Sequence, residues 1–200
     1  MNIGIDVDGV LTDIQGYNNR HAPGFFLKHF NREVVDEKPY DIRDIFNCTE
    51  EEYKMYWKKY LLRYTTLEPA RKGAKKFIHQ LRRDGHKIII ISKRVFSCRD
   101  DFLGRLTRLI MKNWLCRNGL SYDEVIFCDN DIPDSKRTAC VEKSIDIMID
   151  DEVVNIEAVA TIAKAICYDA SYNRDCEGEN IMRACDWNEI YTLIKGLRDE

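Results

Sequence analysis

The feature that most constrains the fold of this chain is a regular alternation of short apolar runs with stretches of helical periodicity. The apolar runs are rich in Ile and Val and span residues 3–8, 87–92, 125–128, 145–150 and 165–168. Helices are expected between and after them, at residues 70–84, 99–118, 135–143, 153–163 and 187–197. Short buried strands separated by helices are typical of a parallel sheet covered on both faces. The sequence therefore predicts a doubly wound α/β fold with five parallel strands.

Residues 14–68 interrupt this alternation directly after the first strand. They show no strand pattern, but Thr49-Glu50-Glu51-Glu52 has the form of a capping box that opens a helix running to about Arg63. Aromatic residues recur along that helix at helical spacing, and we interpret them as the segment's own core, with a base-stacking platform as the alternative: Tyr53, Trp57, Tyr60 and Tyr64. The prediction is a helical cap, or lid, at residues 14–68, inserted into an α/β core domain formed by residues 1–13 and 69–200.

The composition argues against several classes of protein. With a net charge of −3 and no cluster of Lys and Arg, the chain is not expected to bind a nucleic-acid polymer. Its longest apolar run, residues 87–92, is strand-sized, so no membrane-spanning segment is predicted. The N-terminus shows no signal-peptide pattern, and the eight cysteines form no C-x-x-C pair. We therefore expect a cytoplasmic protein with reduced thiols.

Two carboxylates end the first apolar run, in the sequence Asp6-Val7-Asp8-Gly9. A buried strand tolerates such charges only where it ends at a site, because an unpaired buried carboxylate is very costly. The alternation of a strand places both side chains on the same side of the chain, so that one can attack a substrate while the other moves a proton. The alternative is a pair of aspartates that only cap a turn.

Another acidic pair, Asp150-Asp151, ends the apolar run 145–150. Mg²⁺ takes oxygen ligands and is usually held by one or two carboxylates, together with water and substrate phosphate. One of the two aspartates is also expected to cap the next helix. A third strand end carries Ser92-Lys93-Arg94, whose hydroxyl and guanidinium can bind a phosphate oxygen. Since the carboxyl ends of parallel strands meet at one edge, the three motifs predict a single site.

The order of these motifs resembles the haloacid dehalogenase-like (HAD) phosphohydrolase superfamily. Within it, the chain is similar to the C-type 5′-nucleotidase and deoxyribonucleotidase family over nearly its whole length. The family pattern also covers further residues, which are Tyr40-Asp41-Ile42, Thr49-Glu50-Glu51-Glu52, Pro69, Gly73-Ala74, Tyr172-Asn173-Arg174 and Trp187-Asn188-Glu189-Ile190. The resemblance implies a HAD-like sheet with a small helical cap after the first strand.

The resemblance also implies a mechanism with an aspartyl-phosphate intermediate. Asp6 would be the nucleophile and Asp8 the general acid/base. Asp6, the carbonyl of Asp8 and Asp150 would bind Mg²⁺, with Asp151 in support. Phosphoryl transfer requires positioning and charge neutralisation above all, and a carboxylate nucleophile needs no base to ionise it at neutral pH.

Phosphate binding is assigned by the same resemblance to Ser92 and a lysine, and we place Arg94 and Gly9 beside them. The chain departs from the family pattern at Lys93, where related sequences usually have a small residue between the hydroxyl and the arginine. The positive charge of Lys93 would affect the geometry of the phosphate site and the charge that the protein prefers on its substrate.

Two lysines are candidates for the phosphate ligand, and chain direction distinguishes them. The strand at 125–128 runs up to the site, so the helix 135–143 must run back down before the strand 145–150 climbs again. Lys136 therefore lies at the top of that helix, and Lys143 about 10 Å lower at 1.5 Å per residue. Lys136 also lies in the first helical turn, which favours anions. We expect Lys136 to reach the site; the alternative is a solvated surface lysine.

The predicted partner is a small soluble phosphomonoester, with a nucleoside monophosphate favoured by the resemblance. A phosphatase of sugar or polyol phosphates is the main alternative, because cap inserts set specificity in this superfamily and the fold does not. A signalling receiver domain places its acidic pair and its phosphoacceptor on different strands, unlike this chain. A non-catalytic module that binds phosphate and Mg²⁺ is disfavoured by the intact Asp6, Asp8 and Asp150. The sequence does not define an oligomeric state.

Overall fold

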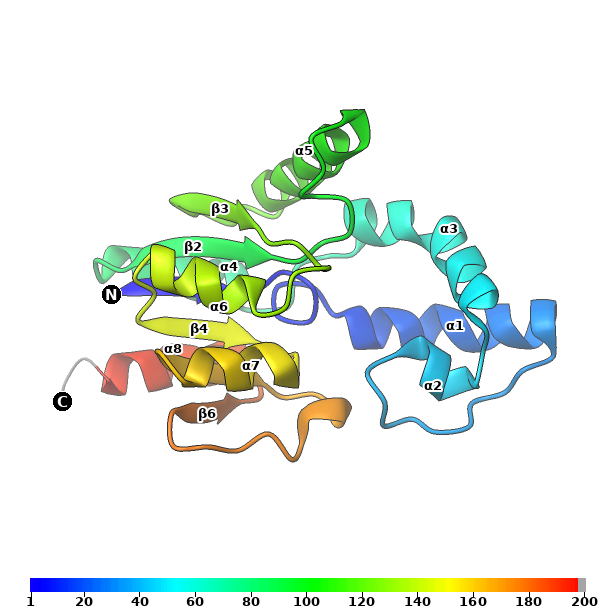
Figure 1. Ribbon diagram of the computed structural model, residues 1–200. Coiled ribbons are helices and arrows are strands. Elements are labelled where there is room, and N and C mark those ends of the chain that lie inside the picture. The colour runs from blue at the N-terminus through cyan, green and yellow to red at the C-terminus, as the bar shows by residue number, and fades with distance from the viewer. Residues whose placement is uncertain (198–200) are drawn as a thin grey trace.

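A six-stranded parallel sheet forms the centre of the computed structural model, which describes residues 1–197 (Figure 1). The strands are β1 (Asn2–Ile5), β2 (Lys87–Ser92), β3 (Glu124–Phe127), β4 (Ile147–Asp150), β5 (Lys164–Tyr168) and β6 (Ile181–Ala184). Their order is β3-β2-β1-β4-β5-β6, and every neighbouring pair is parallel. The predicted doubly wound α/β fold is confirmed.

The prediction of five strands is wrong, because β6 adds a sixth at the edge beside β5. Its sequence, Ile181-Met182-Arg183-Ala184, contains an arginine and is only partly buried along most of its length. An edge strand has one neighbour and needs no continuous apolar run. The pattern typical of a buried parallel strand is therefore missing.

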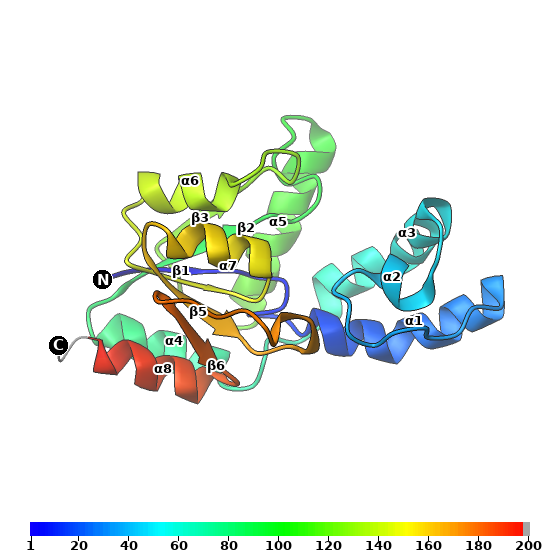
Figure 2. The same cartoon turned by 60° about the horizontal axis from the view of Figure 1, so that its bottom comes forward.

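Helices cover both faces of the sheet (Figure 2). On one face lie α4 (Ala74–Arg83), α5 (Phe102–Arg117) and α8 (Trp187–Gly196), and on the other α6 (Ser135–Glu142) and α7 (Val153–Ala160). The strands alternate between the two cores: Ile88 and Ile90 pack on the first face, Ile89 and Ile91 on the second. No helix within residues 1–197 has both the length and the apolar character needed to cross a bilayer.

The chain reverses its direction of winding between β1 and β4, at the centre of the sheet. Ile5 of β1 lies beside Ile149 of β4, and the Asp6 amide donates to the Ile149 carbonyl at 3.0 Å. This register places Asp6 next to Asp150 at the carboxyl ends of the two strands. Ligands of open α/β sheets bind at such a crossover point.

Strand β1 is shorter than predicted, which changes how its two aspartates are presented. It ends at Ile5, so Asp6 and Asp8 lie in the turn that follows and not in the strand itself. The amides of Leu11 and Thr12 both donate to the Val7 carbonyl and close this turn. Strand alternation therefore does not set the direction of the Asp8 side chain.

Three helices lie beyond the carboxyl ends of the strands (Figure 1). They are α1 (Ile14–Phe30), α2 (Ile42–Phe46) and α3 (Glu50–Leu67). The predicted capping box is confirmed at Thr49 and Glu52, and α3 continues four residues beyond the expected end at Arg63. The three helices enclose a hydrophobic cluster of their own, with a core of Ala22, Phe25, Phe26, Ile42, Phe46 and Tyr56. We refer to residues 14–67 as the α1–α3 segment.

Candidate active site

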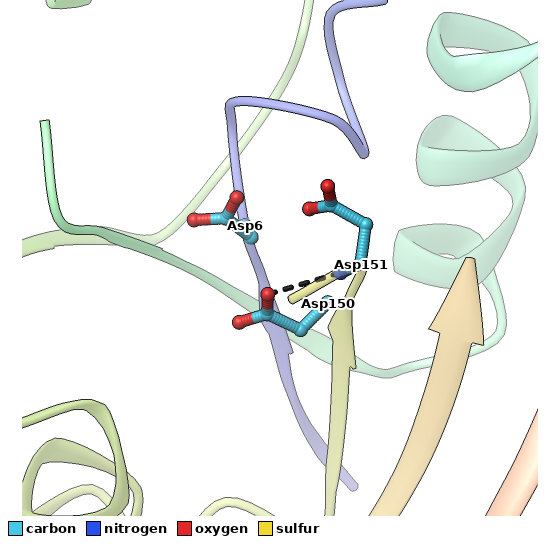
Figure 3. Close-up of side chains that lie close together, drawn as sticks. All are labelled: Asp6, Asp150 and Asp151. Carbon is cyan, nitrogen blue, oxygen red and sulfur yellow. Dashed lines mark hydrogen bonds between the residues drawn. The ribbon is translucent and has the colours of Figure 1, made fainter. Parts of the chain in front are cut away.

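Three buried aspartates meet where β1 and β4 end (Figure 3). Asp6, Asp150 and Asp151 each contribute a carboxylate oxygen, and these oxygens lie within 4.8 Å of one another. Burial raises the pKa of Asp6 to about 7; Lys136 opposes this shift, and Asp150 adds to it. Burial, followed by the charges of Asp150 and Asp6, also raises the pKa of Asp151. The three carboxylates therefore lie close together, and the positive charge around them does not balance their negative charge.

Lys136 is the cation that contacts this cluster. Its Nζ lies 2.7 Å from Asp6 Oδ1 and 2.6 Å from Asp150 Oδ2. Burial alone would lower the pKa of Lys136, but the charges of Asp150 and Asp6 outweigh it and raise the pKa. Lys143, the other candidate, instead forms an ion pair with Glu124 outside the cluster.

The donor set fits a divalent cation. Three carboxylates and one ammonium group leave a formal charge of −2 (−3 + 1) in a buried space. All the carboxylate donors are hard oxygens, which suit Mg²⁺, Ca²⁺ or Mn²⁺ and not a thiolate-binding metal. A bound divalent cation would neutralise this charge and favour the ionised form of each aspartate.

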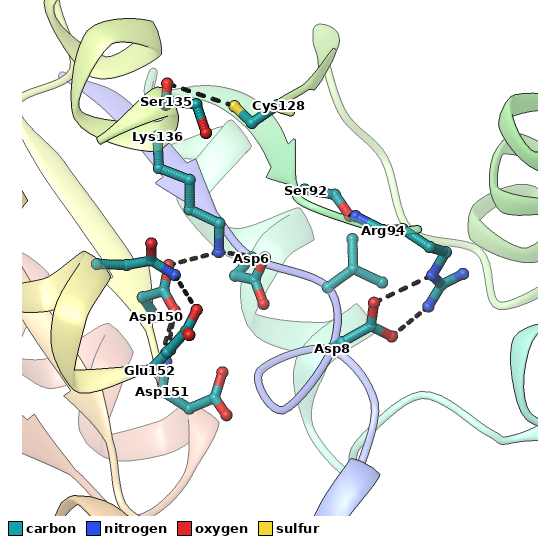
Figure 4. A network of polar contacts seen from close by, with 12 residues as sticks. Asp6, Asp8, Ser92, Arg94, Cys128, Ser135, Lys136, Asp150, Asp151 and Glu152 are labelled. Atoms are coloured by element: carbon teal, nitrogen blue, oxygen red, sulfur yellow. Dashed lines mark hydrogen bonds and ion pairs between the residues drawn. The ribbon is translucent and has the colours of Figure 1, made fainter. Parts of the chain in front are cut away.

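Asp8 has different partners from Asp6 (Figure 4). Arg94 donates to it through Nε, at 3.1 Å from Oδ2, and through Nη2 to Oδ1. The phenol of Tyr64, in α3, donates to Asp8 Oδ1 at 2.7 Å. Burial would raise the pKa of Asp8, but Arg94 and these hydrogen bonds outweigh it and lower the pKa. Asp8 is therefore held ionised, and one of its partners comes from the α1–α3 segment.

The predicted phosphate ligands lie around the same strand ends. Ser92 is buried at the end of β2, and its Oγ accepts a hydrogen bond from the Arg94 amide at 3.2 Å. Arg94 is also buried, and among the described residues its Nη1 has no hydrogen-bond partner. Gly9 has a φ of 103°, and a Cβ there would lie 2.0 Å from Asp151 Oδ2. Only glycine can bring the backbone this close to the cluster.

Sequence reasoning missed some of the residues that contact these aspartates. Tyr64 was interpreted as core of the cap, yet it bonds Asp8; its place in a regular aromatic stripe hides this contact. Tyr172 donates to Asp151 Oδ2, and Asn173 Nδ2 donates to the Asp151 carbonyl at 2.8 Å. The only sequence signal for this pair is that Tyr172-Asn173 belongs to the family pattern.

A pocket opens between the α1–α3 segment and Tyr172. It is lined by Ile14, Gln15, Asn18, Asn19, Pro39, Tyr40, Asp41, Ile42, Ile45, Tyr53, Trp57 and Tyr172. Aromatic rings and uncharged amides dominate this lining, and it contains no Lys or Arg. Such a surface suits a planar, neutral polar group better than an anion.

Comparisons with known proteins agree with this architecture. A nucleotidase of Clostridium acetobutylicum is 24% identical over 200 residues, covering 98% of this chain and 95% of that protein. The crystal structure of a predicted phosphatase from the same organism superposes with a TM-score of 0.66 at 15% identity, covering 98% of each chain. D,D-heptose 1,7-bisphosphate phosphatase from B. bronchiseptica, crystallised with magnesium and phosphate, superposes with a TM-score of 0.55 at 13% identity, again over 98% of each chain.

The sheet order and the acidic strand ends define a protein with the HAD-like fold, shared with crystal structures of that superfamily. More narrowly, the chain belongs to the family described as 5′ nucleotidase, deoxy (pyrimidine), cytosolic type C protein, whose sequence model matches residues 1–199.

Proposed function

We propose that this protein is a Mg²⁺-dependent phosphomonoester hydrolase that acts on nucleoside monophosphates through an aspartyl-phosphate. The observation that carries the proposal is the buried cluster of Asp6, Asp150, Asp151 and Lys136 at the crossover point of the sheet. Such a cluster opposes folding unless it serves a ligand, because carboxylates this close repel one another in a low-dielectric setting. Membership of a nucleotidase family supports the same reaction.

In the proposed reaction, Asp6 is the nucleophile and Asp8 transfers the protons. The Asp6 carboxylate attacks phosphorus, the bond to the leaving oxygen breaks, and Asp8 gives that oxygen a proton. Asp8 then takes a proton from the water that hydrolyses the aspartyl-phosphate, which releases phosphate and regenerates Asp6. The lowered pKa of Asp8 suits this second half-reaction. Before the first half-reaction Asp8 must take up a proton from solvent, and this requires its release from Arg94.

The metal would be held by Asp6, Asp150, Asp151 and the backbone carbonyl of Asp8. When bound, Mg²⁺ neutralises the repulsion between the nucleophile and an anionic phosphate. The structural relative crystallised with magnesium and phosphate supports this choice of ion.

The phosphate group would be held by the cations and small groups around the strand ends. Lys136 lies beside Asp6 and offers a charge-assisted hydrogen bond. Further donors are Ser92 Oγ and Arg94 Nη1, which has no hydrogen-bond partner within residues 1–197. Gly9 lets the backbone approach the site without a side chain in the way.

The α1–α3 segment would act as the cap of the enzyme, with residues 14–68 as the lid and residues 1–13 and 69–200 as the core domain. Lids exclude water and commit the substrate to reaction. The pocket beneath this lid matches a nucleobase, because aromatic residues such as Tyr40 and Trp57 can stack on a flat ring and Asn18 can bond its edge. A sugar or polyol phosphate is the second candidate, since amides also bind hydroxyl groups.

A panel of phosphomonoesters tests the choice of substrate. Nucleoside 5′-monophosphates should give a kcat/KM at least about tenfold above those of glucose 6-phosphate and glycerol phosphate, because stacking a base contributes about 1–3 kcal/mol. The Trp57→Ala variant should lose this preference and retain its activity on glycerol phosphate. Equal kcat/KM values for all three classes in the wild-type protein would contradict a nucleotidase.

Removal of the metal provides a separate test. Treatment with EDTA followed by dialysis should reduce phosphatase activity to background, because no metal ion would then offset the repulsion between the aspartates of the cluster and the anionic phosphate. Addition of excess Mg²⁺ should restore activity, as measured by release of inorganic phosphate. Full activity after exhaustive chelation would contradict the metal site.

A further inference from the structure

The short 3₁₀ helix η1 (Ser171–Asn173) holds Asp151 by two consecutive side chains. Tyr172 donates its phenolic hydrogen to Asp151 Oδ2, and Asn173 Nδ2 donates to the Asp151 carbonyl at 2.8 Å. Both the carboxylate and the backbone of Asp151 are therefore fixed from the same side. Neither residue takes part in the reaction proposed above.

The same short helix also contacts the α1–α3 segment. The ring of Tyr172 meets the ring of Tyr40 edge to face, with centroids 4.9 Å apart at 77°. Ser171 Oγ accepts a hydrogen bond from Gln15 Nε2 of α1 and lies 3.4 Å from the Glu37 carbonyl, to which it donates. Gln15, Glu37 and Tyr40 all belong to residues 14–67, so η1 touches the segment at three points.

The sheet anchors η1 from below, through Asn173. Its Nδ2 also donates to the Tyr168 carbonyl of β5 at 2.8 Å, and its Oδ1 accepts from Arg183 Nη1 of β6 at 3.0 Å. The Ala170 amide donates to the same Oδ1 at 3.0 Å. Asn173 is buried and well satisfied, so η1 is a rigid support and Tyr172 projects from it in a fixed direction.

We propose that Tyr172 is a positioning residue that sets the orientation of the Asp151 carboxylate for the metal and links it to the α1–α3 segment. The inference rests on the proposed function, because the ion it serves is the one assigned above. A carboxylate can rotate about its last torsion, and a hydrogen bond to one oxygen fixes that rotation before the cation arrives. Groups that orient metal ligands in this way typically contribute about 10- to 100-fold in metal affinity.

Tyr172 connects Asp151 to the α1–α3 segment, because its ring contacts Tyr40 while its hydroxyl contacts Asp151. Tyr172 lines the pocket together with Tyr40, and its hydroxyl bonds Asp151. A ligand or movement that pushes Tyr40 toward Tyr172 therefore also restricts the rotation of the Asp151 carboxylate. By thermodynamic linkage, metal binding at Asp151 must favour the same position of Tyr40. The edge strand β6, which the sequence did not predict, carries the arginine that braces this arrangement.

Direct metal binding tests the proposal without reference to turnover. Mn²⁺ is titrated into metal-free protein, and the free ion is measured by electron paramagnetic resonance. Tyr172→Phe removes only the hydroxyl and should raise the Kd for Mn²⁺ about tenfold. The melting temperature of the metal-free variant should match that of the wild type, whereas the increase caused by added Mn²⁺ should shrink.

Tyr191→Phe is the matched control. Its hydroxyl also donates to a carboxylate, that of Asp84 at 2.9 Å, but this pair joins α8 to the end of α4. The variant should bind Mn²⁺ with the wild-type Kd. An equal loss in both tyrosine variants would indicate general loosening of the fold and would overturn the positioning role.

Tyr40 variants test the link to the α1–α3 segment. Tyr40→Phe keeps the ring and should bind Mn²⁺ as the wild type does, whereas Tyr40→Ala should weaken binding a few-fold. Because Tyr40 acts through Tyr172, the double variant Tyr40→Ala/Tyr172→Phe should bind no more weakly than Tyr172→Phe alone. Fully additive losses would overturn the link.

The outcomes separate the two proposals. A wild-type protein that binds no Mn²⁺ would overturn the metal site, and the role of Tyr172 with it. Wild-type binding together with a Tyr172→Phe Kd within twofold of the wild-type value would overturn the role of Tyr172 alone and leave the proposed function standing.

Discussion

Replacing Asp6 with asparagine is expected to lower kcat by at least about 10³-fold, the scale of loss seen when a nucleophile is removed from a covalent mechanism. A carboxamide has the shape of the carboxylate but cannot attack phosphorus. Its oxygen can still accept the hydrogen bond that Lys136 now gives to Asp6 Oδ1 at 2.7 Å. The loss should therefore appear in kcat, measured by phosphate release under saturating substrate.

The stability of the same variant provides the control for folding. The pKa of Asp6, raised to about 7, means that ionising this buried group destabilises the metal-free protein as the pH rises from about 4 to about 7. Asp6→Asn removes that penalty, so the metal-free variant should melt at pH 7.5 no lower than the wild type. Asp146→Asn, at the opposite end of the sheet, should keep full activity. A folded Asp6→Asn protein with appreciable turnover would rule out the covalent mechanism.

Replacing Lys136 with alanine is expected to reduce kcat/KM by about 10²- to 10³-fold, the usual loss for one preorganised charged donor. The ammonium group bridges Asp6 and Asp150, so its removal leaves the nucleophile and a metal ligand without their shared cation. Loss of one partner from a buried ion pair typically costs about 3–5 kcal/mol. The metal-free variant should accordingly melt well below the wild type, and added Mg²⁺ should recover part of the difference.

Lys143→Ala is the natural comparison, because Lys143 leaves the same helix at its other end. Its ammonium group pairs with Glu124 on a partly exposed surface, where ion pairs contribute about 0–1 kcal/mol. The variant should keep wild-type kcat/KM and nearly wild-type stability. If Lys136→Ala kept near-wild-type kcat/KM and Lys143→Ala lost most of it, the phosphate site would have been assigned to the wrong lysine.

The meeting of Asp6, Asp150 and Lys136 could be predicted because it depends mainly on chain direction. Parallel strands bring their carboxyl ends to one edge, and a helix that descends from that edge must begin there. These rules involve backbone geometry and few side-chain details. The same reasoning gave the wrong end for β1, because the turn after Ile5 depends on Gly9 with its φ of 103°.

The partners of Asp8 could not be predicted in this way. Arg94 and Tyr64 are 86 and 56 residues away from it in the chain. Their contacts depend on where α3 lies above the sheet and on which rotamer each long side chain adopts. The helix α1 was equally hidden, because Pro23 lies inside it and removes the amide donor that the pattern of a helix requires.

The separate hydrophobic cluster of the α1–α3 segment has a consequence for how this protein can evolve. Its core, built around Phe26, Phe46 and Tyr56, shares no residue with the clusters that bury the sheet. Substitutions that reshape the lining near Tyr53 or Trp57 therefore leave the packing beneath the nucleophile untouched. Descendants of this chain can change the lining of the pocket while the sheet beneath Asp6 keeps its packing, provided that Tyr64 keeps its hydrogen bond to Asp8.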